Sequence, residues 1–291
     1  MDKCILELKN LKKYYGDTVG IEDVSIKLNK GEIYGFIGPN GAGKSTTIRT
    51  IIGLINKTDG NIYFNGELLD NNDVKTKSKI GYLPSEINLY EDMSVKEIFD
   101  YHEKFYSKNL SKRRCELVRL LQLDETRKIE DLSLGNLKKV GIILALMHEP
   151  ELLILDEATS GLDPIMQNVF HNILLEEKKK GTTILYSSHI LSEVASICDR
   201  VGFIKNGIIL KEDSMKNIKK NDFTYVTINS KEIDKIKKDL KLEIKEETSD
   251  GVKFINNIKT NTLIKKLANY DIDKLLIENI SLEDLFTNYY K

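Results

Sequence analysis

The hydrophobic and polar positions of this chain change their period several times, and each change marks a different element. A strand begins near Ile5, and Val24 to Leu28 alternates apolar and polar residues, the period-two pattern of a half-buried strand. Ile33 to Ile37 is a short apolar run that leads into a glycine-rich loop. Apolar residues then recur at helical spacing from Ile48 to Ile55. This order predicts strand, loop and helix.

Helical patterns take over from Ser94. Ser94 and Glu97 match a capping box, in which each residue satisfies a backbone N–H of the other at the start of a helix. Apolar and aromatic residues follow at helical spacing as far as Phe105, which predicts one buried face. Two further helices are predicted over about Ser111 to Leu121 and about Gly135 to Met147.

Two short apolar runs then alternate with helical segments. Leu152 to Leu155 and Thr183 to Tyr186 are too short for buried helices and indicate buried strands. Strands that alternate with helices favour a parallel sheet covered on its faces.

The composition shifts near Lys220 toward Lys, Ile and Asn. We interpret residues 221–291 as a small α+β appendage and residues 1–220 as the main domain. Strand and helix patterns alternate in the appendage: strands at Phe223 to Ile228, Leu242 to Ile244 and Val252 to Ile255, and helices at Ile233 to Leu240 and Thr262 to Leu267.

The overall charge and the cysteines exclude several classes of protein. The formal net charge of −1 lacks the basic excess usual in nucleic-acid binders, so we expect no nucleic-acid partner. Cys4, Cys115 and Cys198 are scattered, which fits a reducing compartment rather than a disulfide framework. The longest apolar run, Val140 to Met147, is far shorter than the ~20 residues that span a bilayer. A membrane process would need its membrane part from another chain.

The glycine-rich loop fits the phosphate-binding pattern G-x-x-x-x-G-K-[ST]. Its glycines let successive backbone N–H groups point into one concavity, and the following helix aims its positive end at the phosphates. Lys44 is predicted to reach the β- and γ-phosphates, and the Ser45 hydroxyl to bind Mg²⁺. The predicted ATP-binding residues here are Gly38, Pro39, Asn40, Gly41, Ala42, Gly43, Lys44, Ser45 and Thr46.

Two carboxylates follow the strand Leu152 to Leu155. At the carboxyl end of a parallel strand they open onto the ligand crevice. Asp156 suits a role in holding Mg²⁺, and Glu157 suits a general base that polarises the attacking water. With the phosphate loop upstream, this pair indicates an ATP-hydrolysing site.

Further segments resemble the motifs of the ABC ATPase family, in that family's order, so that the resemblance covers essentially the whole chain. They are Tyr15-Gly16 as the loop that stacks on adenine, Asp131 to Asn136 as the signature, Ser160 to Pro164 as the D-loop and Tyr186 to His189 as the switch-histidine loop.

The resemblance implies roles for these residues. His189 would contact the γ-phosphate, and together with Lys44 and Glu157 it forms the predicted catalytic set. Tyr15 would stack on adenine, with neighbouring Tyr14 as the alternative. Ser133 and Gly135 in the signature would present a hydroxyl and backbone N–H groups to a γ-phosphate held by the opposite chain.

Two motifs depart from the family pattern. The signature has Leu134 where the family has glycine and Asn136 where it has glutamine. After Gly81 to Pro84, Ser85 stands where the family has the glutamine of its Q-loop. Serine is too short to reach as far, so either a water bridges Ser85 to Mg²⁺ or Glu86 substitutes.

The resemblance implies an α/β fold. Its parts are a P-loop NTPase core with a parallel sheet, an N-terminal antiparallel β subdomain, a helical subdomain inserted at about residues 86–147, and the C-terminal appendage. The closing run Ile280 to Phe286 resembles the tail of a branch of bacterial exporter ATPases. We therefore expect an ATP- and Mg²⁺-dependent ATPase subunit at the cytoplasmic side of a bacterial membrane.

The expected partners are a separate transmembrane permease, facing the loop from Pro84 to Met93, and a second ATP-binding chain in a homodimer or a heterodimer. A soluble ABC ATPase that acts on nucleic acid or the ribosome is the alternative. The single phosphate loop, and the lack of sustained heptads between Ser45 and Leu132, disfavour it.

Overall fold

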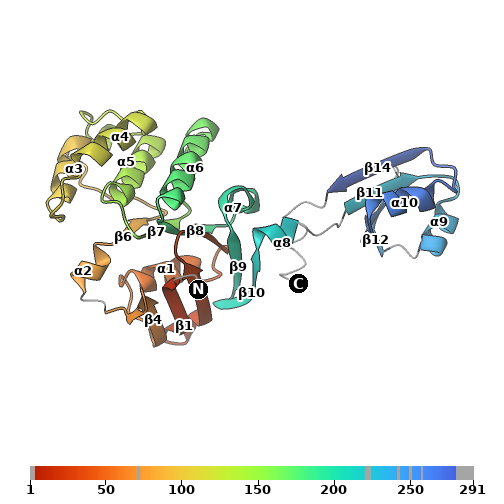
Figure 1. Ribbon diagram of the computed structural model, residues 1–291, viewed down its shortest axis with the longest axis horizontal. Coiled ribbons are helices and arrows are strands. Elements are labelled where there is room, and N and C mark those ends of the chain that lie inside the picture. Colours follow the sequence, from red (N-terminus) through yellow and green to blue (C-terminus); the bar gives the residue numbers. More distant parts are fainter. Residues whose placement is uncertain are drawn as a thin grey trace. The chain divides into compact units, whose positions relative to one another are not determined.

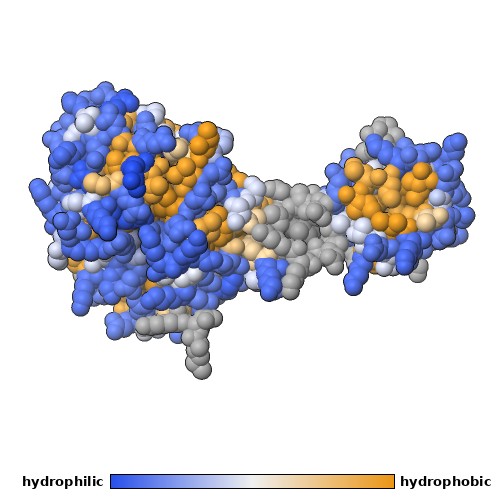
Figure 2. Space-filling model, turned by 45° about the horizontal axis from the view of Figure 1, so that its top comes forward, coloured by the Kyte–Doolittle hydropathy of each residue, from blue (hydrophilic) through white to orange (hydrophobic). Residues whose placement is uncertain are grey.

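The computed structural model describes residues 4–70, 73–219, 224–240, 243–248, 251–256 and 258–279. The chain forms two compact units, Met1–Met215 and Lys216–Lys291 (Figure 1). The closing run from Ile280 to Phe286, which carried the resemblance to exporter ATPases, lies outside the described residues. Figure 2 shows a largely hydrophilic surface with a hydrophobic area on each unit.

The first unit is built on one ten-stranded sheet in the order β5-β4-β1-β2-β10-β9-β3-β8-β7-β6. The strands are β1 (Cys4–Tyr15), β2 (Thr18–Asn29), β3 (Ile33–Ile37), β4 (Asp59–Phe64), β5 (Glu67–Leu68), β6 (Ile80–Leu83), β7 (Leu152–Asp156), β8 (Thr183–Ser188), β9 (Arg200–Lys205) and β10 (Ile208–Ser214).

The sheet has a parallel part and an antiparallel part. Strand β3 pairs in parallel with both β8 and β9, and β7 lies in parallel between β6 and β8. Every residue of β3, β7 and β8 is buried, as expected for parallel strands covered on both faces. Strands β1, β2 and β4 pair antiparallel, which confirms the expected antiparallel region. The two parts form one mixed sheet, because β10 pairs with β9 and, at Ile208 and Asp23, with β2.

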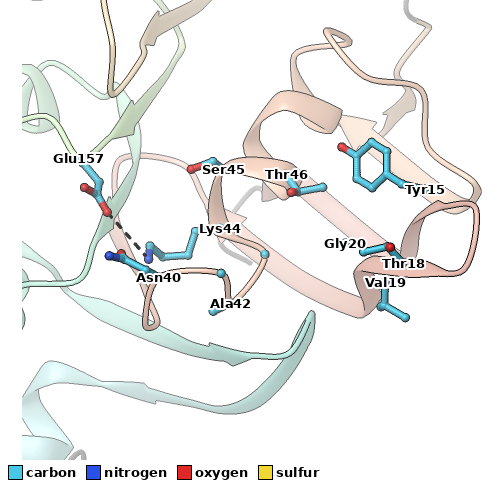
Figure 3. A pocket seen from close by; sticks show the side chains of 12 residues that line it. Tyr15, Thr18, Val19, Gly20, Asn40, Ala42, Lys44, Ser45, Thr46 and Glu157 are labelled. Atoms are coloured by element: carbon cyan, nitrogen blue, oxygen red, sulfur yellow. Dashed lines mark ion pairs between the residues drawn. The ribbon is translucent and has the colours of Figure 1, made fainter.

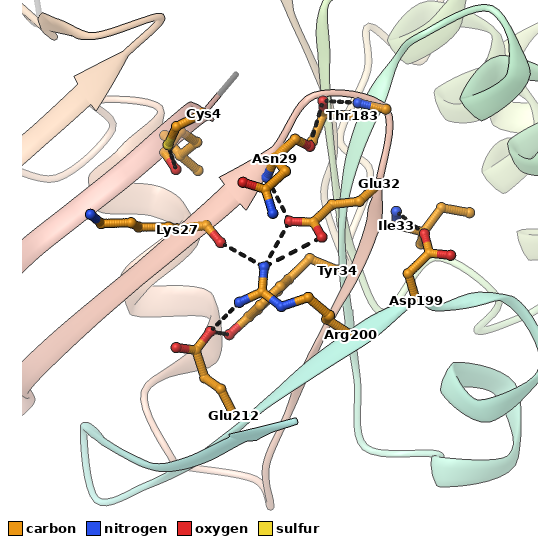
Figure 4. Close-up of polar contacts among 12 residues, drawn as sticks. Cys4, Lys27, Asn29, Glu32, Ile33, Tyr34, Thr183, Asp199, Arg200 and Glu212 are labelled. Atoms are coloured by element: carbon orange, nitrogen blue, oxygen red, sulfur yellow. Dashed lines mark hydrogen bonds and ion pairs between the residues drawn. The ribbon is translucent and has the colours of Figure 1, made fainter. Parts of the chain in front are cut away.

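A cluster of charged side chains supports the strands where the two parts of the sheet meet (Figure 4). Arg200 Nη1 donates to the Glu32 carboxylate at 3.0 Å, and Nη2 donates to Glu212 at 3.2 Å. The Tyr34 hydroxyl donates to Glu212 at 2.5 Å, and the guanidinium lies over the Tyr34 ring. These contacts link β3, β9 and β10, so they hold the strand that enters the phosphate loop against its neighbours.

The helices of the first unit are α1 (Lys44–Ile51), α2 (Val74–Lys77), α3 (Val95–Glu103), α4 (Ser111–Leu121), the 3₁₀ turn η1 (Ile129–Asp131), α5 (Leu134–Leu146), α6 (Pro164–Lys179) and α7 (Leu191–Ile197), and α8 (Met215–Lys219) follows at the junction of the units. Helices α3, α4 and α5 gather together (Figure 1). The capping box of Ser94 and Glu97 is confirmed. The predicted buried face is wrong at Phe105, which lies beyond the end of α3 and is 66% exposed.

Helix α5 packs closely on strand β6 because both carry glycine at the contact. A Cβ on Gly81 would lie 2.1 Å from the Ala145 carbonyl oxygen, and one on Gly141 would lie 2.4 Å from Ile87 Cδ1. Gly81 therefore cannot accept a side chain without moving the backbone of the helix, whereas a side chain at Gly141 would displace the side-chain ends of Ile87 and Leu83. The close contact fixes α5 beside the loop that follows β6.

The second unit has a βαββαβ order with an antiparallel sheet arranged β12-β13-β11-β14. Its elements are β11 (Thr224–Asn229), α9 (Ile233–Leu240), β12 (Glu243–Thr248), β13 (Gly251–Asn256), α10 (Thr260–Leu267) and β14 (Lys274–Asn279). Ile236 of α9 and Leu263 of α10 share a core with Val226 and Phe254 of the sheet. In the part of the chain that the structure describes, no helix is both long enough and apolar enough to span a bilayer.

Candidate active site

A pocket of about 340 Å³ lies at the start of α1 (Figure 3). It brings together the phosphate loop, the end of β1, the start of β2 and the acidic residue after β7. Its lining consists of Tyr15, Thr18, Val19, Gly20, Asn40, Gly41, Ala42, Gly43, Lys44, Ser45, Thr46 and Glu157.

The phosphate loop takes its shape from glycines in left-handed conformations. Gly41 has φ 79° and Gly43 has φ 103°. A Cβ on Gly43 would lie 2.7 Å from the carbonyl oxygen of Gly20, so only glycine fits between the loop and β2. Helix α1 begins at the next residue, Lys44. Its first N–H groups and the hydroxyls of Ser45 and Thr46 are therefore available to an anion in the pocket.

Lys44 places its ammonium group inside the site. The side chain is 5% exposed, and Nζ donates to the carbonyl oxygens of Gly38 (2.6 Å) and Pro39 (3.1 Å). Burial lowers the pKa of Lys44, while the Glu157 and Asp156 carboxylates act in the opposite direction. Glu157 Oε1 lies 4.0 Å from Nζ. Gly38 and Pro39 thus contact the site through Lys44 and do not line the pocket.

Asp156 is fully buried at the end of β7. Its Oδ1 accepts a hydrogen bond from Ser187 Oγ at 3.2 Å, whereas Oδ2 has no hydrogen-bond partner among the described residues. A buried carboxylate oxygen without a partner is costly in an otherwise satisfied interior. Mg²⁺ prefers oxygen ligands, so the free carboxylate oxygen of Asp156 and the hydroxyl of Ser45 fit that ion.

Glu157 is held in a left-handed conformation, with φ 49°. This conformation is unfavourable for a residue with a side chain, and such strain is typical of functional sites. Glu157 Oε1 lies 3.0 Å from His189 Nδ1. The structure therefore brings together the three predicted catalytic residues, Lys44, Glu157 and His189.

The sequence did not single out Glu193, which organises the loops around this site. Its carboxylate accepts hydrogen bonds from Thr159 Oγ1 (2.7 Å), the Tyr186 hydroxyl (3.1 Å) and Ser188 Oγ (3.2 Å). Glu193 thereby ties the loop after β7 to the end of β8. Glu193 lies four residues after His189, in the first turn of α7, and this position in the sequence could have indicated a role near the site.

Tyr15 lines the pocket, and Tyr14 does not. The Tyr15 ring is 48% exposed and passes directly over Gly20, where a Cβ would lie 2.9 Å from Tyr15 Cε2. Gly20 is a second residue that the sequence did not single out. Its lack of a side chain lets the Tyr15 ring come close to β2 at the side of the pocket.

The predicted signature residues lie apart from the pocket lining. Ser133 is exposed and caps α5 by accepting from the Asn136 N–H at 3.4 Å. Gly135 packs on the D-loop, since a Cβ there would lie 2.8 Å from the Gly161 carbonyl oxygen. Neighbouring Leu134 is 66% exposed. Ser85, predicted to bind the metal, also does not line the pocket.

The sequence and the fold are similar to those of known proteins. A family model described as ABC transporter matches residues 21–160. The chain is similar to the bacitracin transport ATP-binding protein of Bacillus licheniformis, with 34% identity over 97% of this chain and 96% of that protein. It is 40% identical to the linearmycin resistance ATP-binding protein of Bacillus subtilis over 70% of this chain and 67% of that protein. A bacterial ABC transporter cassette solved as a dimer matches with TM-score 0.66 and 25% identity, covering 72% of this chain and 99% of that one.

Proposed function

We propose that this chain, which belongs to the family of ABC transporter ATP-binding proteins, drives an export system by closing on ATP against a second ATP-binding chain. Proteins of this family hydrolyse ATP, and the chain is an ABC ATPase. The observation that carries the proposal is the meeting of Lys44, Glu157 and His189 at the phosphate loop.

The pocket suggests how ATP is held and attacked. The start of α1 and Lys44 would receive the β- and γ-phosphates, and the Tyr15 ring would stack on adenine. Glu157 would take a proton from the attacking water. His189 Nδ1, 3.0 Å from Glu157 Oε1, would donate to that carboxylate and orient it, and in the imidazolium form the ring would also donate its Nε2–H toward the γ-phosphate.

We assign Mg²⁺ to the region between Ser45 and Asp156. The Asp156 Oδ2 atom, which has no hydrogen-bond partner among the described residues, supports this assignment. Ser85, in the loop after β6, would join them through a water. Mg²⁺, when bound, would neutralise charge that develops on the phosphates.

The second chain would complete each ATP site. Ser133 and Gly135 do not line the pocket of their own chain, and Ser133 caps an exposed helix start beside the exposed side chain of Leu134. We infer that these residues act on ATP bound by the opposite chain, as backbone N–H donors and a hydroxyl suited to a γ-phosphate. The similar cassette solved as a dimer supports two chains, identical or different.

The relatives support export and a membrane partner. One is named for bacitracin transport and another for linearmycin resistance, so we infer an exporter of antibiotic-like compounds. This ATP-binding subunit would lie at the cytoplasmic side of a bacterial membrane and bind a separate permease. We assign the contact to the loop from Pro84 to Met93, where Tyr90 is 63% exposed. Residues 1–220 would form the ATPase domain and 221–291 the appendage.

We expect Glu157→Gln to bind ATP and to lose turnover by ~10² to 10⁴, the usual contribution of a positioned base. Lys44→Ala should weaken both binding and turnover. Phosphate release and equilibrium ATP binding by purified protein measure the two effects. Glu149→Gln is the matched control, because this carboxylate pairs with Lys108 on the surface. Normal turnover in Glu157→Gln would refute its role as base.

A further inference from the structure

Helix α5 carries a buried lysine that no part of the proposed mechanism uses. Lys138 is 2% exposed, and Lys44 is the one other lysine in the buried set of the described residues. A buried ammonium group is expensive unless it is well paired. The contacts of Lys138 therefore require an explanation.

Lys138 holds the loop that follows β6 by its backbone. Nζ donates to the carbonyl oxygens of Ser85 at 2.8 Å and Pro84 at 3.4 Å. The same ammonium group lies in the field of Asp156 and Glu157, whose attraction opposes the lowering of its pKa by burial. Lys138 thus bonds to the loop and interacts electrostatically with the acid pair.

An apolar contact fixes the same loop to the same helix. Ile87 packs against α5 at Gly141, where a Cβ would lie 2.4 Å from Ile87 Cδ1. Gly141 is three residues after Lys138, so both contacts lie on one face of the helix. The loop from Pro84 to Ile87 is therefore attached to α5 at two points, one polar and one apolar.

We propose that Lys138 is a positioning residue that couples the loop after β6 to the signature helix. In the proposed function the short Ser85 side chain acts on the metal site only through a water. The ammonium group of Lys138 contacts the loop directly from α5, by donating a hydrogen bond to the carbonyl oxygen of Ser85. This inference deepens the proposed function and rests on it. The start of α5, which acts on the opposite ATP, and the loop that faces the permease then move together.

A purely structural lysine would behave differently. Lys138→Met removes the ammonium group and leaves the carbonyl oxygens of Pro84 and Ser85 without that donor, so we expect a lower melting temperature whichever role Lys138 has. The two roles differ in the protein that remains folded. A positioning role predicts a released loop and a lower kcat, whereas a purely structural role predicts a normal loop and a normal kcat.

The experiment compares Lys138→Met with Lys139→Met, the same substitution at the next, half-buried residue. Hydrogen exchange of the backbone amides at 85–88 in nucleotide-free protein reports the loop. Phosphate release gives kcat and KM for ATP. We expect Lys138→Met to speed exchange and lower kcat by ~10-fold each, the equivalent of one hydrogen bond to a charged group, with KM little changed. Lys139→Met should change neither.

Unchanged loop exchange and kcat in folded Lys138→Met would overturn the proposal. If Lys138→Met fails to fold, Lys138→Gln, which retains a donor for the carbonyl groups, replaces it. The exchange rate of Lys138→Gln should lie between the wild-type rate and the ~10-fold faster rate expected of Lys138→Met. An exchange rate equal to that of wild type, together with a normal kcat, would again overturn the proposal. The exchange measurement needs no ATP, so its failure is distinguishable from a failure of the proposed ATPase function, which would show as wild-type protein without turnover.

Discussion

Single residues set the geometry of the nucleotide pocket. Gly20 lacks the Cβ that would meet the Tyr15 ring at 2.9 Å, so the ring can lie along the pocket wall. Glu157 accepts a left-handed conformation that places its carboxylate between Lys44 and His189. In both places an unusual local conformation is tied to a position that the proposed chemistry needs.

Tyr15→Ala should weaken ATP binding by between ~5-fold and ~150-fold, the range expected for losing one aromatic stacking partner of a base. Tyr14→Ala is the control, because Tyr14 does not line the pocket. Titration with ATP and with triphosphate alone measures the effect, and only ATP should lose affinity. Equal losses in the two variants, or a loss confined to Tyr14→Ala, would contradict the assignment.

The residues predicted from sequence are those whose role depends on neighbours in the chain. The phosphate loop and the pair Asp156 and Glu157 each form a continuous segment, so their pattern was visible. Glu193 was missed because its partner Thr159 lies 34 residues away. Lys138 was missed because its contact with Ser85 spans 53 residues. Contacts across such separations exist only once the fold has formed.

At the scale of elements, helices α3 and α5 bring together the half-buried His102 and the buried His148. His102 belongs to α3 and His148 follows α5, with their ring centroids 6.0 Å apart. Tyr106 stacks on His148 at 4.8 Å. Burial lowers the pKa of His148 from its ordinary 6.5 to about 4, and nearby His102 adds to the effect. Acid must therefore oppose the packing of these helices.

The sign of this effect follows from the lowered pKa. The folded protein binds fewer protons at His148 than the unfolded chain, so its stability is complete above pH 6.5 and is lost as the pH falls toward about 4. Between pH 7 and pH 5 we expect wild type to lose about 2 kcal/mol more unfolding free energy than His148→Phe. Urea unfolding at the two pH values tests this. Equal losses would contradict it.

Element boundaries were predictable where the local sequence marks them. The helix at Ser111–Leu121 and the strand at Ile33–Ile37 have the predicted limits. Strand β14 was not predicted, because Lys274–Asn279 gains its order from pairing with β11. Of the strand predicted at Leu242 to Ile244, Leu242 lies outside the described residues, and β12 continues past Ile244 to Thr248, where pairing with β13 extends it.

At the scale of the whole molecule, the account requires two chains for each working site. Lys44 and Ser133 would act on one ATP molecule from opposite chains. For a homodimer, mixing Lys44→Ala with Ser133→Arg leaves one site with both mutations and one site with neither. Adding Glu157→Gln to both chains blocks hydrolysis, so closed dimers accumulate and can be counted with labelled ATP after size-exclusion chromatography.

This count of trapped ATP tests the central claim most directly. Each variant alone should fail to form closed dimers, because both of its sites lack a required residue. The mixture should form them with one occluded ATP per dimer, against two in the Glu157→Gln parent. A mixture without closed dimers, beside a parent that closes normally, would contradict a site composed of Lys44 from one chain and Ser133 from the other.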